Sequence, residues 1–235
     1  LDRARRAHGV EAVLGTRVQR LLVEDGRVVG VVADDIEVRA HAVVVASGGF
    51  AQNRDLLEQY YPYPLGAGES LFVVAAPGSR GDHFRFGEQV DSAIAGKDWG
   101  LTMPTAYFQR YHHWQAGFPP KSRVYVNKSG RRFMDEDASY AVSGGLMDRQ
   151  DGPVWAIFDE KARTGLPAGY TDWDADRIAE EADAGRTLRA DSLPELADLI
   201  GVPVDALVTT IDRWNTQLPN GIDPEFLRHR TLANK

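Results

Sequence analysis

An uninterrupted apolar run, residues 42–46, leads directly into Ser47-Gly48-Gly49-Phe50. Such a run is typical of a strand buried on both faces, as in a parallel sheet covered by helices. The glycine pair allows a tight turn after the strand, and Asn53 stands where it can cap a following helix. This feature therefore favours an α/β fold for the first part of the chain.

The same turn has two interpretations on the residues alone. A strand that ends in two glycines lets the backbone approach a ligand closely, and the start of the following helix favours an anionic group. The other interpretation is a tight turn that binds nothing. The glycine pair does not by itself decide between a binding turn and a structural one.

More strands and helices are expected around this turn. The pair Asp25-Gly26 predicts a two-residue hairpin turn, because both residues readily adopt positive φ angles. Helices are expected at 2–8 and 82–95, strands at 11–23, 28–32 and 36–40, and a loop over 60–80.

Near Lys97 the sequence changes character, and we predict a domain boundary there. An aromatic cluster follows, made of Trp99, Tyr107, Phe108, Tyr111 and Trp114. Beyond it, the pattern predicts strands at 124–127 and 154–158 and helices at 174–184, 192–200 and 203–216. Ser192 and Glu195 form a capping-box pattern at the start of one of these helices. The predicted domains are residues 1–97 and 98–235.

Composition argues against several classes of protein. The chain has 235 residues, a net charge of −7 and no cysteine, so disulfides and cysteine-ligated metals are excluded. The acidic balance argues against non-specific nucleic-acid binding, which needs a basic face. No run approaches the ~20 apolar residues of a membrane span, no signal peptide is visible, and no cluster has metal-ligand spacing. We therefore expect a cytoplasmic protein without a metal.

Two further stretches combine charged and apolar residues. Arg131 and Arg132 stand beside Asp135 and Glu136, which on the residues alone is typical of a solvated, salt-bridged edge. The second stretch, residues 191–226, is amphipathic and by itself favours a structural helix pair over a catalytic element.

Taken together and in their order along the chain, these motifs make the sequence resemble the fumarate reductase/succinate dehydrogenase flavoprotein superfamily, in its soluble FAD-dependent branch. The matching segments are 25–31, 45–50 with Asn53, 60–62, 81–82, 126–136 and 192–226. The resemblance implies an FAD-binding, Rossmann-like domain interrupted by an α+β cap that covers the substrate. Residues 1–97 would be the second part of the FAD domain and 98–235 the cap. The family's glycine-rich fingerprint is not in this chain, and the chain does not begin with Met, so we expect an internal piece of a longer flavoenzyme.

The resemblance also implies which residues contact FAD. His83 stands where the family's Gly-Asp-Gly contact has its second glycine. The implied cofactor-binding residues are Val18, Ala46, Ser47, Gly48, Gly49, Phe50, Asn53, Gly81 and Asp82.

Tyr140 points to one branch of the superfamily. Fumarate reductases have a proton-delivering arginine at this position, whereas 3-ketosteroid dehydrogenases have a tyrosine that abstracts a proton while flavin takes a hydride. The segment 132–136 is closer to the second pattern, although Asp135 replaces the usual asparagine. A phenol, with an ordinary pKa of ~10, can act as a base when a hydrogen bond or positive charge stabilises the phenolate. The resemblance therefore implies that Tyr140 is the catalytic base.

An apolar, steroid-like substrate is the matching expectation, because a dicarboxylate would need several cations. The implied substrate-lining residues are Trp99, Met103, Tyr107 and Phe108, although any of these aromatic residues can instead be cap core. Two alternatives stay open. One is a fumarate-reductase-like or other ene-reductase flavoprotein. The other is an isolated domain that is inactive without further FAD-binding segments. The electron acceptor is not indicated.

Overall fold

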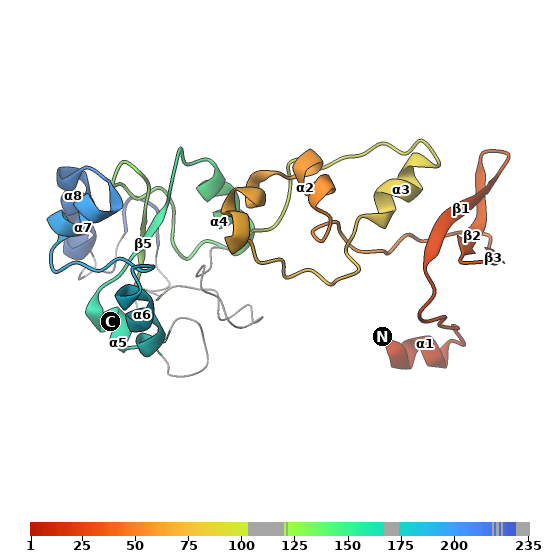
Figure 1. Ribbon diagram of the computed structural model, residues 1–235, viewed down its shortest axis with the longest axis horizontal. Coiled ribbons are helices and arrows are strands. Elements are labelled where there is room, and N and C mark those ends of the chain that lie inside the picture. Colours follow the sequence, from red (N-terminus) through yellow and green to blue (C-terminus); the bar gives the residue numbers. More distant parts are fainter. Residues whose placement is uncertain are drawn as a thin grey trace. The chain divides into compact units, whose positions relative to one another are not determined.

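The computed structural model describes residues 1–102, 120, 122–166, 174–217, 219, 221 and 223–228. The chain divides into two compact units. The first contains Leu1–Leu65 and Phe72–Trp99, and the second contains Gly66–Leu71 and Gly100–Lys235. Figure 1 shows the elements of both units. The assignment of these units to a flavin domain and a cap stays a prediction.

A three-stranded antiparallel sheet forms most of the regular structure at the start of the first unit. Its order is β1-β2-β3, and it follows a short helix. The bounds are α1 Asp2–Ala7, β1 Val18–Glu24, β2 Arg27–Ala33 and β3 Ile36–Arg39. Asp25 and Gly26 connect β1 to β2 with φ angles of 49° and 74°, which confirms the predicted hairpin. Gly30 lies so close to β3 that a Cβ there would collide with the Val38 carbonyl oxygen.

The predicted buried strand at 42–46 is wrong. The segment pairs with no strand among the described residues, and Val44 is 88% exposed. A buried parallel strand needs neighbouring strands, and the sheet that precedes this segment consists of β1, β2 and β3 in antiparallel pairs that do not include it. The apolar sequence therefore specifies a strand only where a partner is present.

The remaining elements of the first unit are α2 Arg54–Tyr60, the 3₁₀ segment η1 Tyr63–Ser70, whose last five residues belong to the second unit, and α3 Asp82–Glu88. The predicted 60–80 loop thus contains a 3₁₀ segment, which is kinked at Gly68 with φ 57°. The helix expected over 82–95 ends at Glu88, because the chain turns back where Ser92 N–H donates to the Gly87 carbonyl at 2.9 Å. Leu57 and Phe86 are the buried residues of α2 and α3.

The second unit combines a two-stranded antiparallel sheet with helices. Its elements are β4 Val124–Val126, α4 Tyr140–Asp148, β5 Trp155–Ile157, α5 Glu160–Thr164, α6 Ala175–Asp183, α7 Leu193–Ile200 and α8 Val204–Gln217. α7 and α8 pack together (Figure 1), and their apolar residues share one core with those of β4 and β5. The core consists of Val124, Val126, Ala197, Ile200, Val202, Leu207 and Trp214.

Local signals explain how α7 begins and ends. The Ser192 hydroxyl accepts a hydrogen bond from the Glu195 N–H at 3.3 Å, and the Glu195 carboxylate accepts one from the Asp191 N–H at 3.0 Å. Gly201 follows the helix in the left-handed conformation, with φ 69°. The predicted cap at Ser192 is confirmed.

Candidate functional site

Two segments that the sequence singled out for FAD lie side by side in the first unit. Gly81 N–H donates to the Gly49 carbonyl at 3.0 Å, and the Asn53 side-chain amide donates to the Arg80 carbonyl at 3.1 Å. Asn53 also accepts from the Leu56 N–H at 3.3 Å, so its predicted role as the N-cap of α2 is confirmed. Residues 47–53 and 80–82 therefore form one continuous surface.

The three glycines of this surface differ in what they contribute. Gly81 has φ 84°, and a Cβ on it would collide with Leu56 Cδ1 and lie 3.1 Å from Phe50 Cβ. Gly48 has φ 78°, and a Cβ on Gly49 would meet nothing within 4 Å. Gly81 is thus needed for packing, whereas Gly48 and Gly49 leave exposed backbone that a ligand can approach.

The Phe50 ring, which follows the glycine pair of this surface, packs against two other aromatic rings. The Phe50 ring lies 5.3 Å from Phe84 and 6.3 Å from Tyr60, both edge-on, and Tyr60 stacks on Phe84 at 4.5 Å. Because Phe50 immediately follows the glycine pair, its packing fixes the turn relative to α2 and α3.

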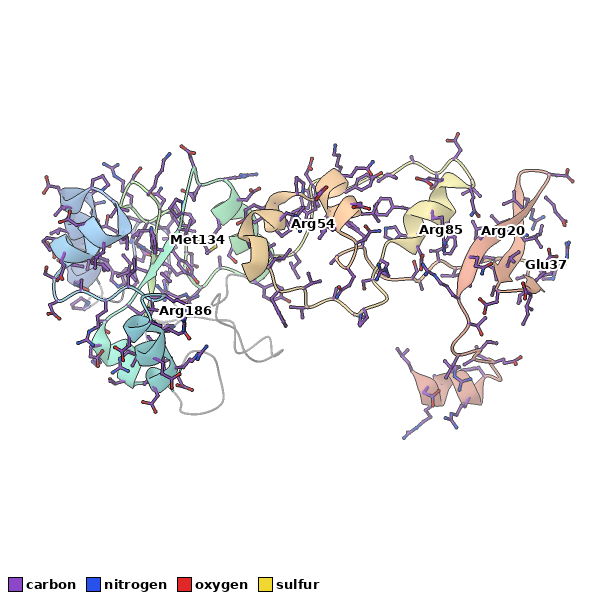
Figure 2. All side chains as sticks on the ribbon, in the orientation of Figure 1. Arg20, Glu37, Arg54, Arg85, Met134 and Arg186 are labelled. Carbon is purple, nitrogen blue, oxygen red and sulfur yellow. The ribbon has the colours of Figure 1, made fainter. Side chains whose placement is uncertain are left out.

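A hollow of about 300 Å³ opens beside these segments, lined by Arg17, Asn53, Leu56, Arg80, Gly81, Asp82, Phe84, Arg85 and Glu88. The Asp82 carboxylate accepts hydrogen bonds from Arg17 at 3.0 Å and from Arg85 at 3.1 Å. Arg85 also donates to the Val18 carbonyl at 3.1 Å, which ties β1 to α3; Figure 2 labels Arg85 on α3. The three arginines outnumber the two carboxylates, so the hollow favours an anionic group.

FAD fits the residues of this surface on two observations. The backbone at Gly48 and Gly49 is open, with room above Gly49 for a flat ring or a phosphate. Ser47 Oγ is buried and has no hydrogen-bond partner among the described residues, and the same holds for His83 Nδ1. A buried hydroxyl of this kind normally has a partner, which a bound cofactor could supply. Ala46 is exposed next to Ser47.

A buried ion network occupies the second unit, in place of the solvated edge expected around Arg132. Arg132 donates from Nε and Nη2 to the two Glu136 carboxylate oxygens at 2.8 and 2.7 Å. It also donates from Nη1 and Nη2 to Asp223 at 3.0 and 2.7 Å. Its guanidinium lies 4.6 Å from the Trp214 ring centre and 5.1 Å from that of Phe226. The interpretation as a solvated edge is therefore wrong for Arg132 and Glu136, while Arg131 is exposed.

Two more arginines complete this network. Arg228 donates to Asp137, to Glu136 and to the Arg123 carbonyl, and it is fully buried. Arg123 in turn donates to the Glu136 carbonyl and, at 3.0 Å, to the Tyr125 hydroxyl. These contacts join the segments before β4, after β4 and after α8, so the network links parts of the chain that lie far apart in sequence.

The buried charges shift one another's pKa values. Burial lowers the pKa of Arg132, but hydrogen bonds to Glu136 and Asp223 outweigh burial and raise it. Burial raises the pKa of Asp223, but hydrogen bonds from Arg132 outweigh burial and lower it. Arg132 and Asp223 are therefore both charged at neutral pH.

Tyr140, the predicted base, is the first residue of α4, a helix that the sequence did not predict. Ser139 caps this helix by accepting a hydrogen bond from the Ala141 N–H at 3.4 Å. Tyr140 is half-buried. The serine before the helix was the available signal, but Gly144 and Gly145 lowered the helix propensity of the segment.

Gly144 brings a distant segment against the helix of Tyr140. A Cβ on Gly144 would collide with the Thr102 hydroxyl and lie 2.7 Å from the Thr102 carbonyl oxygen. Residues four apart lie on the same face of a helix, so Thr102 passes over the face of α4 that carries Tyr140. Thr102 directly precedes Met103, the first of the predicted substrate-lining residues beyond Trp99.

The predicted substrate-lining residues are only partly covered by the structure. Trp99 ends the first unit and is 82% exposed. Met103, Tyr107, Phe108, Tyr111 and Trp114 lie outside the described residues. Their role stays a prediction.

Comparison with known proteins places the chain in a family. The family model described as FAD binding domain matches residues 1–234. The chain belongs to this family of flavoproteins, and FAD is the cofactor of the family.

Two relatives show which kinds of enzyme in that family the chain is similar to. The chain is 33% identical to NADH:acrylate oxidoreductase of Vibrio harveyi, over 91% of this chain and 22% of the relative. It is 31% identical to 3-oxosteroid 1-dehydrogenase of Mycolicibacterium smegmatis, over 98% of this chain and 44% of the relative. The predicted superfamily, with 3-ketosteroid dehydrogenases and fumarate-reductase-like flavoproteins among its members, is confirmed.

A solved structure agrees with this placement. The crystal structure of 3-ketosteroid Δ1-dehydrogenase from Sterolibacterium denitrificans, in complex with 1,4-androstadiene-3,17-dione, matches with a TM-score of 0.73 and 26% identity. The match covers 96% of this chain and 43% of that one. The chain therefore spans less than half the length of these relatives.

The described residues show neither a metal-binding cluster nor a membrane-spanning helix. Within them, no group of three or more His, Cys, Asp or Glu side chains could hold a metal ion. No helix in the described part of the chain is long and apolar enough to cross a membrane.

Proposed function

We propose that the chain belongs to an FAD-dependent dehydrogenase that desaturates a carbon–carbon bond next to a ketone on a flat, apolar, steroid-like substrate. Two facts support this: 98% of the chain aligns with a 3-oxosteroid 1-dehydrogenase, and a tyrosine stands at the start of α4. The observation that carries the proposal is the placement of Tyr140 on the helix face crossed by Thr102, where the predicted substrate-lining segment begins.

In this proposal Tyr140 is the base. A C–H next to a ketone is acidic, and its proton passes to the phenolate oxygen of Tyr140. Tyr140 is the first residue of α4 and directly follows Ser139, the N-cap of that helix. Bound FAD would supply the hydride-accepting chemistry for the adjacent carbon. The double bond forms between these two carbons.

The other residues of the chain have supporting roles in the proposal. The exposed backbone of Gly48 and Gly49 approaches the cofactor, and Asn53 fixes that turn by capping α2 and bonding Arg80. Trp99, Met103, Tyr107 and Phe108 supply apolar surface for the substrate.

Tyr140→Phe tests the proposal in the flavin-loaded full-length protein. With 4-androstene-3,17-dione as substrate, turnover per bound flavin should fall by ~10²-fold or more, because the variant has no group to take the proton. Tyr61→Phe, which removes a hydroxyl from the first unit, is the matched control and should keep turnover. Unchanged turnover in Tyr140→Phe would remove this residue from the mechanism.

A second candidate is the reduction of an activated double bond, as the 33% identity to an NADH:acrylate oxidoreductase suggests. The two reactions are separated by assaying the same flavin-loaded protein in both directions. Ketosteroid with an artificial electron acceptor tests desaturation, and acrylate or fumarate with a reduced electron donor tests reduction. Activity with the unsaturated acids alone would favour the second candidate.

A further inference from the structure

We propose that Arg228 is a positioning residue for Tyr140, and that it acts by fixing the segment 135–139 that leads into α4. This inference rests on the proposed role of Tyr140 as a base. It assigns a function to a side chain from the far end of the described chain that nothing in the motif around Tyr140 indicates.

Arg228 makes three hydrogen bonds, two of them to the segment that leads into α4. Its Nε donates to Asp137 Oδ2 at 3.0 Å, and its Nη1 donates to Glu136 Oε2 at 3.2 Å and to the Arg123 carbonyl at 2.6 Å. The side chain is fully buried, and its guanidinium carbon lies 5.2 Å from the centre of the Trp214 ring. A planar guanidinium held on several sides has little freedom to move.

The segment from Asp137 to Tyr140 is short and hydrogen-bonded, so the position of Asp137 determines that of Tyr140. Asp137 N–H donates to Asp135 Oδ1 at 2.9 Å, and Ala138 N–H donates to the Asp135 carbonyl at 3.0 Å. Ser139 then caps α4, and Tyr140 is the next residue. Only Ala138 and Ser139 separate Asp137 from Tyr140, so a displaced Asp137 displaces the start of the helix.

The three arginines of the network bond different groups of this segment. Arg132 pairs with Glu136 and Asp223, and Arg123 donates to the Glu136 carbonyl. Arg228 Nε donates to Asp137 Oδ2, whereas Arg132 and Arg123 donate to Glu136. Burying an arginine is costly, and an apolar side chain of similar volume would fill the same space. The property that only arginine supplies here is a set of directed donors.

The test uses the flavin-loaded full-length protein with three variants. Arg228→Met removes the donors and keeps much of the volume, Arg228→Lys keeps the charge, and Asp137→Asn changes the acceptor side. Arg213→Met is the control, because Arg213 pairs with Glu225 at the surface of the same unit. The substrate is 4-androstene-3,17-dione, unlabelled or deuterated at the carbon next to the ketone.

We expect Arg228→Met to lower kcat per bound flavin by about tenfold or more, because small misplacements of reacting groups are costly. KM should change by less than about twofold, and the deuterium isotope effect on kcat should rise as proton abstraction becomes slower. Arg228→Lys should recover part of the rate. Asp137→Asn should shift rate and isotope effect in the same direction, and Arg213→Met should match the parent.

Amide hydrogen exchange supplies a measurement that does not depend on activity. Arg228→Met and Asp137→Asn should exchange faster over 137–142, with peptides of α5 unchanged. A purely structural role would reduce the fraction of folded, flavin-loaded protein and leave kcat per flavin and the isotope effect as in the parent.

The outcomes separate this inference from the proposed function. If Tyr140→Phe is slow while the Arg228 and Asp137 variants keep the parent's rate, isotope effect and exchange, only the positioning role is overturned. If Tyr140→Phe is as fast as the parent, or the parent desaturates no ketosteroid, both proposals are overturned. If Arg228→Met does not fold, Arg228→Lys and Asp137→Asn decide.

Discussion

Gly144 and Gly145 are neighbours in α4 with opposite surroundings. A Cβ on Gly144 would collide with Thr102, whereas a Cβ on Gly145 would meet nothing within 4 Å. Both have negative φ angles, so neither is held by backbone conformation. The difference between them is a direct measure of how closely the segment before Met103 packs on the helix of Tyr140.

Gly144→Ala should therefore lower the free energy of unfolding of the second unit by about 1–3 kcal/mol, the usual effect of forcing a methyl group into a packed site. Gly145→Ala should raise it by about 0.5–1 kcal/mol, because alanine favours the helix. Chemical denaturation followed by circular dichroism measures both values. Equal effects of the two substitutions would show that Thr102 does not lie against α4.

Asn53 acts at the scale of an element, because it caps α2 and bonds the segment that precedes α3. Asn53→Ala should destabilise the first unit by about 1 kcal/mol, as the loss of a cap does, and weaken flavin binding by the full-length protein. Asn53→Asp keeps an oxygen for the Leu56 N–H and loses the donor to Arg80.

Asn53→Asp is thus the control that separates the two contacts. It should retain the stability of α2, measured by denaturation, while flavin titration reports whether the bond to Arg80 matters for the cofactor. A cofactor affinity that is the same in the parent and both variants would contradict a role for this turn in flavin binding.

Elements that depend on neighbours in sequence could be predicted, and those that depend on distant partners could not. The Asp25-Gly26 hairpin and the caps at Asn53 and Ser192 are set within a few residues, so their sequence signals sufficed. Arg132 looked like a surface residue because its partner Asp223 is 91 positions away. α4 escaped prediction for a similar reason, since its two glycines are poor helix formers until Thr102 packs on one of them.

The same limit applies to the candidate site. The glycine turn and the 80–82 segment were predicted to be parts of one cofactor site through a family resemblance, and a hydrogen bond from the Gly81 N–H to the Gly49 carbonyl joins them. The sequence indicated a pair of Arg132 with a nearby carboxylate, but neither its burial nor the contribution of Arg228. Charge spacing reports a possible pair but not whether it is buried.

At the scale of the whole chain, Asp223 and Tyr125 set limits to the pH range in which the second unit is stable. Burial raises the pKa of Asp223, but bonds from Arg132 outweigh burial and bring it below the ordinary 3.8. Its stabilising contribution is complete above that value and is lost as the pH falls through the lowered pKa. Burial raises the pKa of Tyr125 above the ordinary 10.0, so stability falls as the pH rises past 10.0, where the unfolded tyrosine ionises first.

Denaturation at a series of pH values checks both limits. Asp223→Asn should lower stability at neutral pH by about 3 kcal/mol, because it leaves buried arginine charge less compensated, and should flatten the loss in acid. Tyr125→Phe should flatten the loss in alkali. An acid limb of the same steepness in Asp223→Asn and the parent would contradict the assignment.

Residues 1–235 purified by themselves are expected to be colourless. Gly48 and Gly49 are exposed and the hollow beside Asp82 is open, so this surface encloses little of a cofactor as large as FAD. Flavin absorbance of the purified chain, compared with that of the full-length protein, is the measurement. A yellow chain with one flavin per molecule would show that this surface alone suffices.

The bare segment 42–46 has a consequence for how the chain behaves in solution. It offers exposed valines and, within the described part of the chain, backbone amides without a strand beside them. An exposed, uncharged, β-branched stretch of this kind can act as a template for edge-to-edge association and fibre growth. The same five residues that suit a sheet interior therefore make the chain prone to self-assembly whenever nothing covers them, and a charge at Val44 would act as a gatekeeper against it.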